Sequence, residues 1–447
     1  MLIAVGGLII IFAMSSIVWS TEYYVNGNTG NDSNSGTSRT MAFKTISKAE
    51  DVIGGGDKCI VLAGTYNERV STYTSGTPNA LIIYEAEGTV IMKGFTIYAN
   101  YVHINGFEIT NDDNHWRESV GIFVQGQYCE ISNNYIHDVN LEGIKISAQN
   151  PDSPNTKGCT VRNNRIFKAT LSGIEIQGQG HLIQGNDISR TLQKSTSDAD
   201  GMRFFGSGHV IRGNHIHDIR MSDPENVSPH IDCLQTWGPA YNILIEENYL
   251  ENMNDGMQGF MIEVNRSPVR DITIRNNIIK AFRFMNIWEC ENSIIVNNTM
   301  ISELHYTGSS GYGIELHDSP NSKVLNNLMI NVGRHRYKYV YIDETSSLGL
   351  TIGYNCIYMT DGQAAAGSPY AHDFWQVDPK LLDISAGDFH LTSNSPLIDT
   401  GTKISEVKND FDGNSRPYGS SFDIGAYEFI DAETLKPPTI LRVIVVP

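Results

Sequence analysis

The sequence predicts an all-β fold, a right-handed parallel β-helix of about 10–12 coils with an N-terminal helical cap and a C-terminal capping module. Two observations predict this fold. A phrase of alternating apolar residues ending in Asn-Asn-x-Ile recurs along the middle of the chain. A second phrase, typified by Gly143-Ile-Lys-Ile and Gly173-Ile-Glu-Ile, precedes it in each coil. Both alternate with a period of two rather than 3.6, which excludes helical repeats.

The second Asn-type position of the first phrase measures the length of a coil. These positions lie 21 to 34 residues apart, and the shortest spacings define a coil without an inserted loop. Asn suits a sharp turn between strands because it tolerates left-handed and bridging backbone conformations. Stacked Asn side chains can also form a hydrogen-bonded ladder, so we interpret them as scaffold. The positions are Asn134, Asn164, Asn186, Asn214, Asn248, Asn277, Asn298, Asn327 and Asn355.

The N-terminal part predicts a leader followed by a cap. Residues 1–20 are mostly apolar and end in small residues, which is typical of a secretory signal peptide. A retained N-terminal anchor is the alternative, and both place the protein outside the cell or at its surface. A short helix is expected at residues 46–53, where Ser47 and Glu50 form a capping box. A helix before the first coil would cover its apolar edge.

We assign residues 21–360 to the β-helix with its N-terminal cap, 361–430 to a C-terminal capping region and 431–447 to a tail or linker. Six cysteines in 447 residues do not make a disulfide scaffold. Cys129 and Cys159 open equivalent strands, so we expect them to stack as core thiols or to form a bridge.

The net charge of −18 argues against binding to nucleic acid or to an anionic membrane surface. A monomer is expected, with no membrane contact beyond the possible N-terminal anchor.

Three features together resemble one known superfamily. They are the Tyr24-to-Tyr66 opening, the Asn-turn coils and the ending Asp423-Ile-Gly-Ala-Tyr-Glu. They resemble the right-handed β-helix proteins of the pectate-lyase-like superfamily over nearly the whole chain after the leader. That superfamily contains polysaccharide lyases, glycoside hydrolases, epimerases and non-catalytic surface proteins. The resemblance therefore implies a polysaccharide as the partner and leaves the reaction open.

The second phrase predicts a binding groove, because alternate strand residues point outward and neighbouring coils lie about 4.8 Å apart. In this lattice Asp200 and Asp232 stand side by side, and Arg203 lies next to them. Aromatic residues in the same region would offer flat apolar faces to sugar rings. The expected substrate-binding residues are Glu175, Phe205, Gln235, Trp237, Glu263 and Trp288.

A lyase is our first hypothesis for the reaction. In β-elimination of a uronide, Arg203 or Lys145 would take the proton at C5. Asp198, Asp200 and Asp232 would hold calcium through hard oxygen ligands. The stretch Asp198-Ala199-Asp200-Gly201 resembles the calcium-binding stretch of some β-helix pectate lyases. The continuous acidic run and nearby Lys of those enzymes are replaced here by His230-Ile231-Asp232.

Two other functions remain open at this point. A glycoside hydrolase could pair Asp200 with Asp232, or Asp232 with Glu263, and His230 would then tune or orient an acid. A non-catalytic surface protein could use the same aromatic and acidic residues only to hold a glycan.

Overall fold

The structure, a computed structural model, describes residues 20–194, 198–227, 230–252, 258–265, 268–302, 312–332, 339–362, 364–365 and 367–431. Residues 1–19 and 432–447 lie outside the described residues, so the predicted leader and most of the predicted tail stay predictions. Within the described ranges, no helix is long and apolar enough to cross a membrane.

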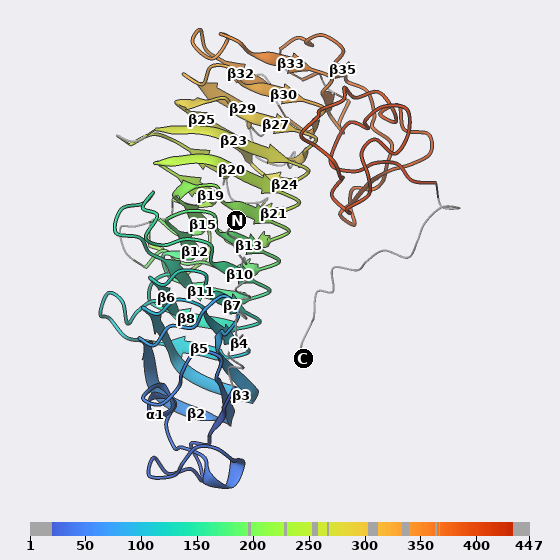
Figure 1. The fold of residues 1–447 in the computed structure, drawn as a ribbon. Coiled ribbons are helices and arrows are strands. Elements are labelled where there is room, and N and C mark those ends of the chain that lie inside the picture. Colours follow the sequence, from blue (N-terminus) through green and yellow to red (C-terminus); the bar gives the residue numbers. More distant parts are fainter. Residues whose placement is uncertain are drawn as a thin grey trace, which may run out of the picture.

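The chain winds into a parallel β-helix (Figure 1), which confirms the predicted fold class. Its strands stack in three columns. The first column comprises β6 (Ile122–Val124), β9 (Ile144–Ile146), β12 (Ser172–Ile176), β15 (Asp200–Phe204), β19 (Asp232–Thr236), β22 (Gln258–Ile262), β25 (Arg283–Trp288), β29 (Tyr312–His317) and β32 (Val340–Ile342). The second comprises β4 (Val102–Asn105), β7 (Glu130–Ser132), β10 (Thr160–Arg162), β13 (Leu182–Gln184), β17 (Val210–Arg212), β20 (Ala240–Glu246), β23 (Val269–Arg275), β27 (Ile294–Val296), β30 (Lys323–Leu325) and β33 (Thr351–Gly353). The third comprises β5 (Glu108–Asn111), β8 (Tyr135–Val139), β11 (Arg165–Ala169), β14 (Asp187–Ser189), β18 (His215–His217), β21 (Tyr249–Asn252), β24 (Ile278–Ala281), β28 (Thr299–Ile301), β31 (Leu328–Ile330), β34 (Cys356–Tyr358) and β35 (Phe374–Trp375).

Two shorter strands and the N-terminal elements complete this parallel sheet. Strands β16 (Gly206–Ser207) and β26 (Cys290–Glu291) pair with β20 and β23 of the second column. The N-terminal elements are β1 (Glu22–Val25), the 3-10 helix η1 (Arg39–Met41), α1 (Ile46–Glu50), β2 (Lys58–Thr72) and β3 (Ile82–Ile97).

The helix α1 begins at Ile46 as predicted, but it ends at Glu50 rather than at residue 53, and its cap differs. Its N-cap is Thr45, whose side chain accepts a hydrogen bond from the backbone N–H of Lys48, so the predicted capping box of Ser47 and Glu50 is wrong. The carboxylate of Glu50 instead accepts bonds from Tyr73 N and Tyr84 Oη. Glu50 is the last residue of the helix, and its side chain ties the helix to the first coils.

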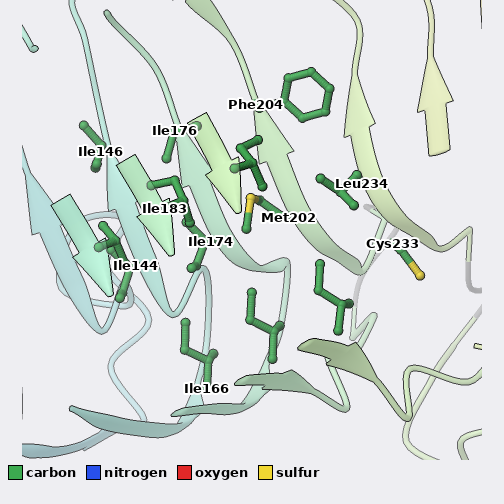
Figure 2. Packing of buried hydrophobic residues seen from close by; sticks show 14 of the residues in the cluster. Ile144, Ile146, Ile166, Ile174, Ile176, Ile183, Met202, Phe204, Cys233 and Leu234 are labelled. Carbon is green, nitrogen blue, oxygen red and sulfur yellow. The ribbon is translucent and has the colours of Figure 1, made fainter. Parts of the chain in front are cut away.

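Inward-facing isoleucines fill the β-helix between its columns. Ile144, Ile174 and Ile176 of the first column are fully buried, and they pair in register from coil to coil. Figure 2 shows them with Met202 and Leu234 of the next coils. β-branched side chains pack well on a pleated surface, which explains why this residue type recurs. The alternate, outward residues of the same strands are thereby fixed in one row.

The predicted Asn ladder is present, and the two Asn of each pair differ in role. Asn164 Nδ2 donates to Asn186 Oδ1 at 3.0 Å, to Ile131 O at 2.9 Å and to Arg162 O at 3.2 Å. Its neighbour Asn163 has a φ of 54°, in the left-handed region. The buried second Asn therefore forms the ladder, and the first takes the turn conformation.

All six cysteines are free and buried, so the Cys129–Cys159 bridge is not formed. Cys129 Sγ donates to Ala99 O at 3.3 Å, and Cys159 Sγ donates to Gly126 O at 3.4 Å. They are core thiols on equivalent strands.

The C-terminal region lies beside the last coils (Figure 1), against the turn between the second and third columns. It contains the antiparallel pair β36 (Leu381–Asp383) and β37 (Asp388–Leu391). The first Asn of three turn pairs donates to its backbone, with Asn276 bonded to Asn409 O, Asn297 to Asp423 O and Asn326 to Thr402 O. Phe389 and Ile424 pack in one cluster with apolar residues on the outer side of the third column.

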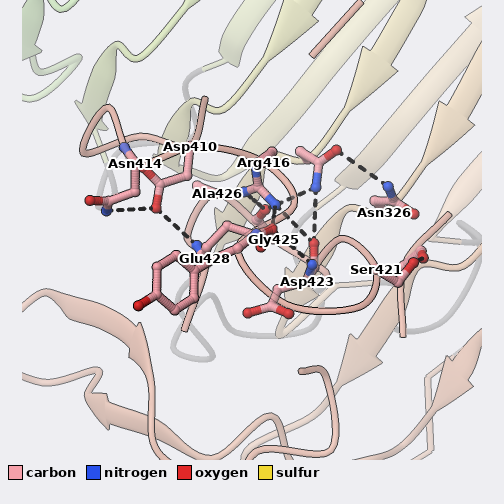
Figure 3. Close-up of polar contacts among 12 residues, drawn as sticks. Asn326, Asp410, Asn414, Arg416, Ser421, Asp423, Gly425, Ala426 and Glu428 are labelled. Atoms are coloured by element: carbon pink, nitrogen blue, oxygen red, sulfur yellow. Dashed lines mark hydrogen bonds and ion pairs between the residues drawn. The ribbon is translucent and has the colours of Figure 1, made fainter. Parts of the chain in front are cut away.

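A buried ion pair holds the Asp423-to-Glu428 phrase in place (Figure 3). Arg416 Nη1 lies 2.6 Å from Glu428 Oε1, and Nη2 donates to Gly425 O at 2.8 Å. Burial raises the pKa of Asp423 to about 7, and the nearby charge of Glu428 adds to the shift. The guanidinium is therefore the main compensating charge in this acidic corner.

Candidate functional site

The outward row of the first column has the predicted register. Glu175 pairs with Lys145 on one side and with Arg203 on the other, and Arg203 pairs with Gln235. The pairing continues through β25, where Asn286 faces Met261 of the previous coil. The alternation of inward Ile and outward polar residues positions these side chains, because a slip of one residue would invert both faces.

Two carboxyl groups lie beside this row, at the first residues of β15 and β19, and both are 0 % exposed. Asp200 Oδ2 accepts from Arg203 Nε at 2.6 Å, and Asp200 Oδ1 accepts from the backbone N–H of Asp232 at 3.0 Å. Asp232 Oδ1 accepts from Gln258 Nε2 at 3.0 Å, but its Oδ2 is buried without a hydrogen-bond partner. The structure thus brings Asp200, Arg203 and Asp232 together on successive coils.

Burial controls the charge of this pair. It raises the pKa of Asp200 to about 6, although Arg203 acts in the opposite direction. Burial and then the neighbouring charge of Asp200 raise the pKa of Asp232 well above its ordinary value. For Arg203, burial alone would lower the pKa, but the charge of Asp200 outweighs it and leaves the pKa raised. The site therefore favours a bound proton on Asp232 and a charged guanidinium on Arg203.

A second layer of polar residues faces the solvent above the buried pair. The side chain of His230 is 56 % exposed, and its Nδ1 lies 3.5 Å from Asp198 Oδ1 and 3.8 Å from Asp232 Oδ2. Asp198 also lies 3.7 Å from Arg203 Nη2. Glu263 is partly exposed. Burial raises the pKa of Glu263, the charge of His230 acts in the opposite direction, and the charge of Asp198 adds to the increase. Asp198, His230 and Glu263 are therefore the groups that a ligand can reach.

An open cavity of about 720 Å³ has the side chain of Trp237 in its wall. Arg203 Cζ lies 5.4 Å from the ring centroid of Trp237, within range of a cation–π contact. Phe205 meets the same ring edge-on at 4.6 Å and is buried, so it supports Trp237 rather than offering a face to a sugar. The remaining cavity wall is formed by Asn150, Pro151, Asp152, Gly238, Pro239, Tyr241, Asn265 and Pro268.

Lys145 belongs to a separate ion-pair cluster. Its Nζ lies 2.5 Å from Glu142 Oε1 and 3.0 Å from Glu175 Oε1. Burial alone would lower the pKa of Lys145, but the charges of Glu142 and Glu175 outweigh it and leave the pKa raised. Lys145 is therefore held protonated two coils away from Arg203, and Glu175 lies between them.

Two other predicted contact residues lie away from the exposed layer. Gln235 is buried beside Arg203, with its Oε1 lacking a hydrogen-bond partner. Trp288 is exposed two coils beyond Asp232, and its ring stacks on His317 at 3.8 Å. Its Nε1 donates to Asn286 Oδ1 at 2.7 Å, so Trp288 forms a separate aromatic surface on the same column.

The three predicted calcium ligands fit a cation only in part. Both oxygens of Asp200 are already bonded, to Arg203 and to the backbone of Asp232. The unpartnered Oδ2 of Asp232 and the carboxylate of Asp198 remain as hard oxygen donors. Among the described residues, the set whose donor atoms all lie within 4.8 Å of one another is a different one, Asp187, His215 and His217. Calcium at Asp198, Asp200 and Asp232 therefore stays a prediction.

Sequence reasoning missed part of the site. Gln258 was not among the predicted site residues, although its side chain donates a hydrogen bond to Asp232. The cavity wall was also missed, because Asp152 and Asn265 come from segments between strands whose paths the repeat does not fix, while Tyr241 lies at the start of β20. The signal that could have found Tyr241 is its position four residues after Trp237.

Comparisons with known proteins agree with the architecture. The family described as "Right handed beta helix region" matches residues 150–280, and a family described as a protein of unknown function, DUF1565, matches residues 71–157. A search of curated protein sequences found no match. The chain is thus a right-handed parallel β-helix protein, as predicted.

Solved structures with the same fold include carbohydrate-related proteins. Pectate lyase Pel9A is 18 % identical, with 92 % of this chain and 97 % of that chain covered and a TM-score of 0.55. XylC in complex with xylose is 13 % identical, with 92 % and 98 % covered and a TM-score of 0.56. The GH136 lacto-N-biosidase from Eubacterium ramulus is 13 % identical, with 76 % and 68 % covered and a TM-score of 0.50. At these identities the similarity establishes the fold.

Proposed function

We propose that the protein is a secreted or cell-surface enzyme that hydrolyses glycosidic bonds of a polysaccharide. One observation carries the proposal: an exposed layer of Asp198, His230 and Glu263 lies over the buried carboxyl of Asp232, which holds a proton, and Trp237 beside Arg203 lines a cavity. Structures with this fold include proteins named for action on glycans or solved with a sugar. The known activities or bound sugars that name those proteins support the substrate class, and the residues of this chain support the reaction.

Glu263 and Asp198 are the carboxyls suited to the two roles of a glycosidase. Glu263 has a raised pKa, chiefly through burial, and it is partly exposed, so it can donate a proton to the leaving oxygen. Asp198 has the guanidinium of Arg203 at 3.7 Å as a cationic partner, which suits a carboxylate that activates water or attacks the sugar. His230 contacts Asp198 and can orient it.

The buried residues act on these groups indirectly. Asp200 and Arg203 form a fixed ion pair, and Asp232 carries the proton that their surroundings favour. Arg203 and Lys145 are both held charged, so neither is suited to take a proton from a sugar carbon. This is the physical reason to place hydrolysis before the β-elimination that the sequence first suggested.

Calcium-dependent β-elimination is the second candidate, and the unpartnered Oδ2 of Asp232 favours it. Asp198 and Asp232 would hold the ion, which when bound would neutralise the carboxylate of a uronate. Because Arg203 and Lys145 are committed to ion pairs, exposed His230 would be the group that takes the C5 proton.

A screen of neutral and uronate-containing polysaccharides tests both candidates. Hydrolysis predicts new reducing ends without ultraviolet absorbance of an unsaturated product, and activity that persists after chelation. Absorbance that requires added calcium would support the lyase instead. Glycan binding without any cleavage, unchanged in Glu263→Gln, would contradict both and indicate a binding protein.

A further inference from the structure

The third column carries a histidine cluster that the proposed reaction does not use. Asp187 lies on β14, and His215 and His217 lie on β18, where alternate residues share one face. Asp187 pairs in register with His215, so the three side chains lie on adjacent coils. Buried Ile188 and Ile216 occupy the intervening inward positions and fix this outward orientation.

The donor atoms of this cluster converge at distances that suit one metal ion. Asp187 Oδ2 lies 3.2 Å from His217 Nε2 and 3.6 Å from His215 Nδ1. One donor atom from each residue can be chosen so that all lie within 4.8 Å of one another. Zinc–ligand distances of about 2.0–2.2 Å place two ligand atoms of a tetrahedral site about 3.3–3.6 Å apart. The cluster therefore has nearly the required spacing before any rearrangement.

The far nitrogens of both histidines face carboxylates. His217 Nδ1 lies 2.9 Å from Asp218 Oδ2, and because a carboxylate only accepts, Nδ1 is the donor. His215 Nε2 lies 3.8 Å from Glu251 Oε2, too far for a hydrogen bond, and it is buried without a partner. Lys280 Nζ holds Glu251 in place at 2.6 Å. Metal-binding histidines commonly donate their second N–H to such a carboxylate, which fixes the ring orientation.

We propose that Asp187, His215 and His217 bind a divalent transition-metal ion, for which zinc is the probe. Two imidazole nitrogens and one carboxylate oxygen suit such an ion, and three protein ligands leave one position for water. Asp218 and Glu251 are positioning residues that orient the two imidazoles. The site lies on a different strand column from Asp200 and Asp232, so it does not rest on the proposed function.

The chain contains a matched control two coils before Asp187. There His137 Nδ1 lies 2.8 Å from Asp138 Oδ2, and its Nε2 lies 3.3 Å from Glu108 Oε1 on the preceding coil. Tyr135 stands where the metal cluster has His215, and its ring stacks on His137 at 4.4 Å. This set repeats the His217 arrangement with one imidazole ligand fewer, so it should not hold zinc with comparable affinity.

The proposal is tested by treating the untagged full-length protein with a chelator, removing the chelator, and then titrating the protein with zinc in a calorimeter. We expect one high-affinity site in the unaltered protein and in His137→Ala. His215→Ala and His217→Ala should weaken binding by at least about a hundredfold, and Asp218→Asn by about 10- to 100-fold. Visible absorption of bound Co²⁺ reports nitrogen and oxygen ligands independently.

Circular dichroism shows whether each variant folds, and His215→Gln and His217→Gln replace any alanine variant that does not. Equal zinc affinity in the unaltered protein and in a folded His217 variant would overturn the proposal. So would the absence of a stoichiometric site, which would leave the cluster as an ion-pair network only.

Discussion

Arg203 donates through Nε to Asp200 Oδ2 at 2.6 Å, and both side chains are almost excluded from solvent. The pair joins two positions three residues apart on β15, at the centre of the first column. Breaking a buried pair from one side leaves an uncompensated charge, whereas the intact pair is nearly balanced. Arg203 is thus the fixed charge of the site rather than its base.

Arg203→Met should destabilise the protein in a pH-dependent way. Asp200 has a pKa of about 6 in the folded protein, above the value of about 3.9 in an unfolded chain. The folded state therefore binds this proton more tightly than the unfolded chain does. The bound proton stabilises the folded state at low pH, and this stabilisation is lost as the pH rises through about 6. Removing the guanidinium should cost about 3–5 kcal/mol of unfolding free energy at pH 7.5, and less at pH 5.

Urea denaturation at the two pH values measures this difference. The exposed pair of Arg270 and Asp271 gives the control, since Arg270→Met should cost less than about 1 kcal/mol. An equal loss for Arg203→Met at both pH values would mean that Asp200 stays ionised.

Glu263→Gln should lower kcat/KM by about 10²–10⁴ while leaving the fold intact, because it removes a general acid. Asp198→Asn should have a similar effect through the loss of the base. Glu263 is active when protonated, and its pKa is raised chiefly by burial, so activity should fall as the pH rises through that raised value. Initial rates across pH check this.

The matched control is Glu289→Gln, an exposed carboxylate directly after β25. It should retain full activity. If the residual activity of Glu263→Gln shows the same fall at high pH, the group whose deprotonation causes that fall is not Glu263.

Trp237→Ala should raise KM about 2- to 10-fold with little change in kcat, because stacking on an aromatic face contributes about 0.5–1.5 kcal/mol. The ring borders the cavity and is not within the layer of exposed carboxyls. Trp116→Ala removes an equally large exposed ring elsewhere and should leave KM unchanged. Steady-state kinetics on the substrate found in the screen separates an effect on KM, which indicates a role in binding, from an effect on kcat, which indicates a role in catalysis.

The first column could be predicted from sequence because two constraints fix it together. A period of two assigns each residue to a face, and the spacing of the Asn ladder fixes which residues of successive coils are neighbours. Asp200 beside Asp232, and Arg203 beside Gln235, follow from these constraints without any knowledge of the loops.

Burial could not be predicted in the same way. The exposure of Asp200 and Asp232 depends on the segments that cover the column, and those segments do not repeat. Phe205 was expected to face a sugar, but its ring packs beneath Trp237. The cluster of Asp187, His215 and His217 was not predicted, because these residues lie on the short strands that follow the ladder Asn residues and outside the phrase that predicts the groove. His215-Ile216-His217, two histidines at a period of two, was the available signal.

The two Asn of one turn pair should respond differently to substitution. Asn164→Ala removes a buried side chain that makes several hydrogen bonds, and each group left unsatisfied costs about 1–3 kcal/mol. Asn163→Gly should be neutral or nearly so, since its φ of 54° suits glycine. Thermal melting compares the two, and equal destabilisation would contradict the separation of ladder and turn roles.

The origin of the oxygen in the cleavage product tests the central claim most directly. Digestion in water enriched in heavy oxygen, followed by mass spectrometry, shows whether solvent oxygen enters the product. Hydrolysis through Glu263 and Asp198 predicts one labelled oxygen for each bond cleaved, and formation of labelled product about 10²–10⁴-fold slower in Glu263→Gln. Products that lack the label and carry a double bond would show β-elimination and contradict the account.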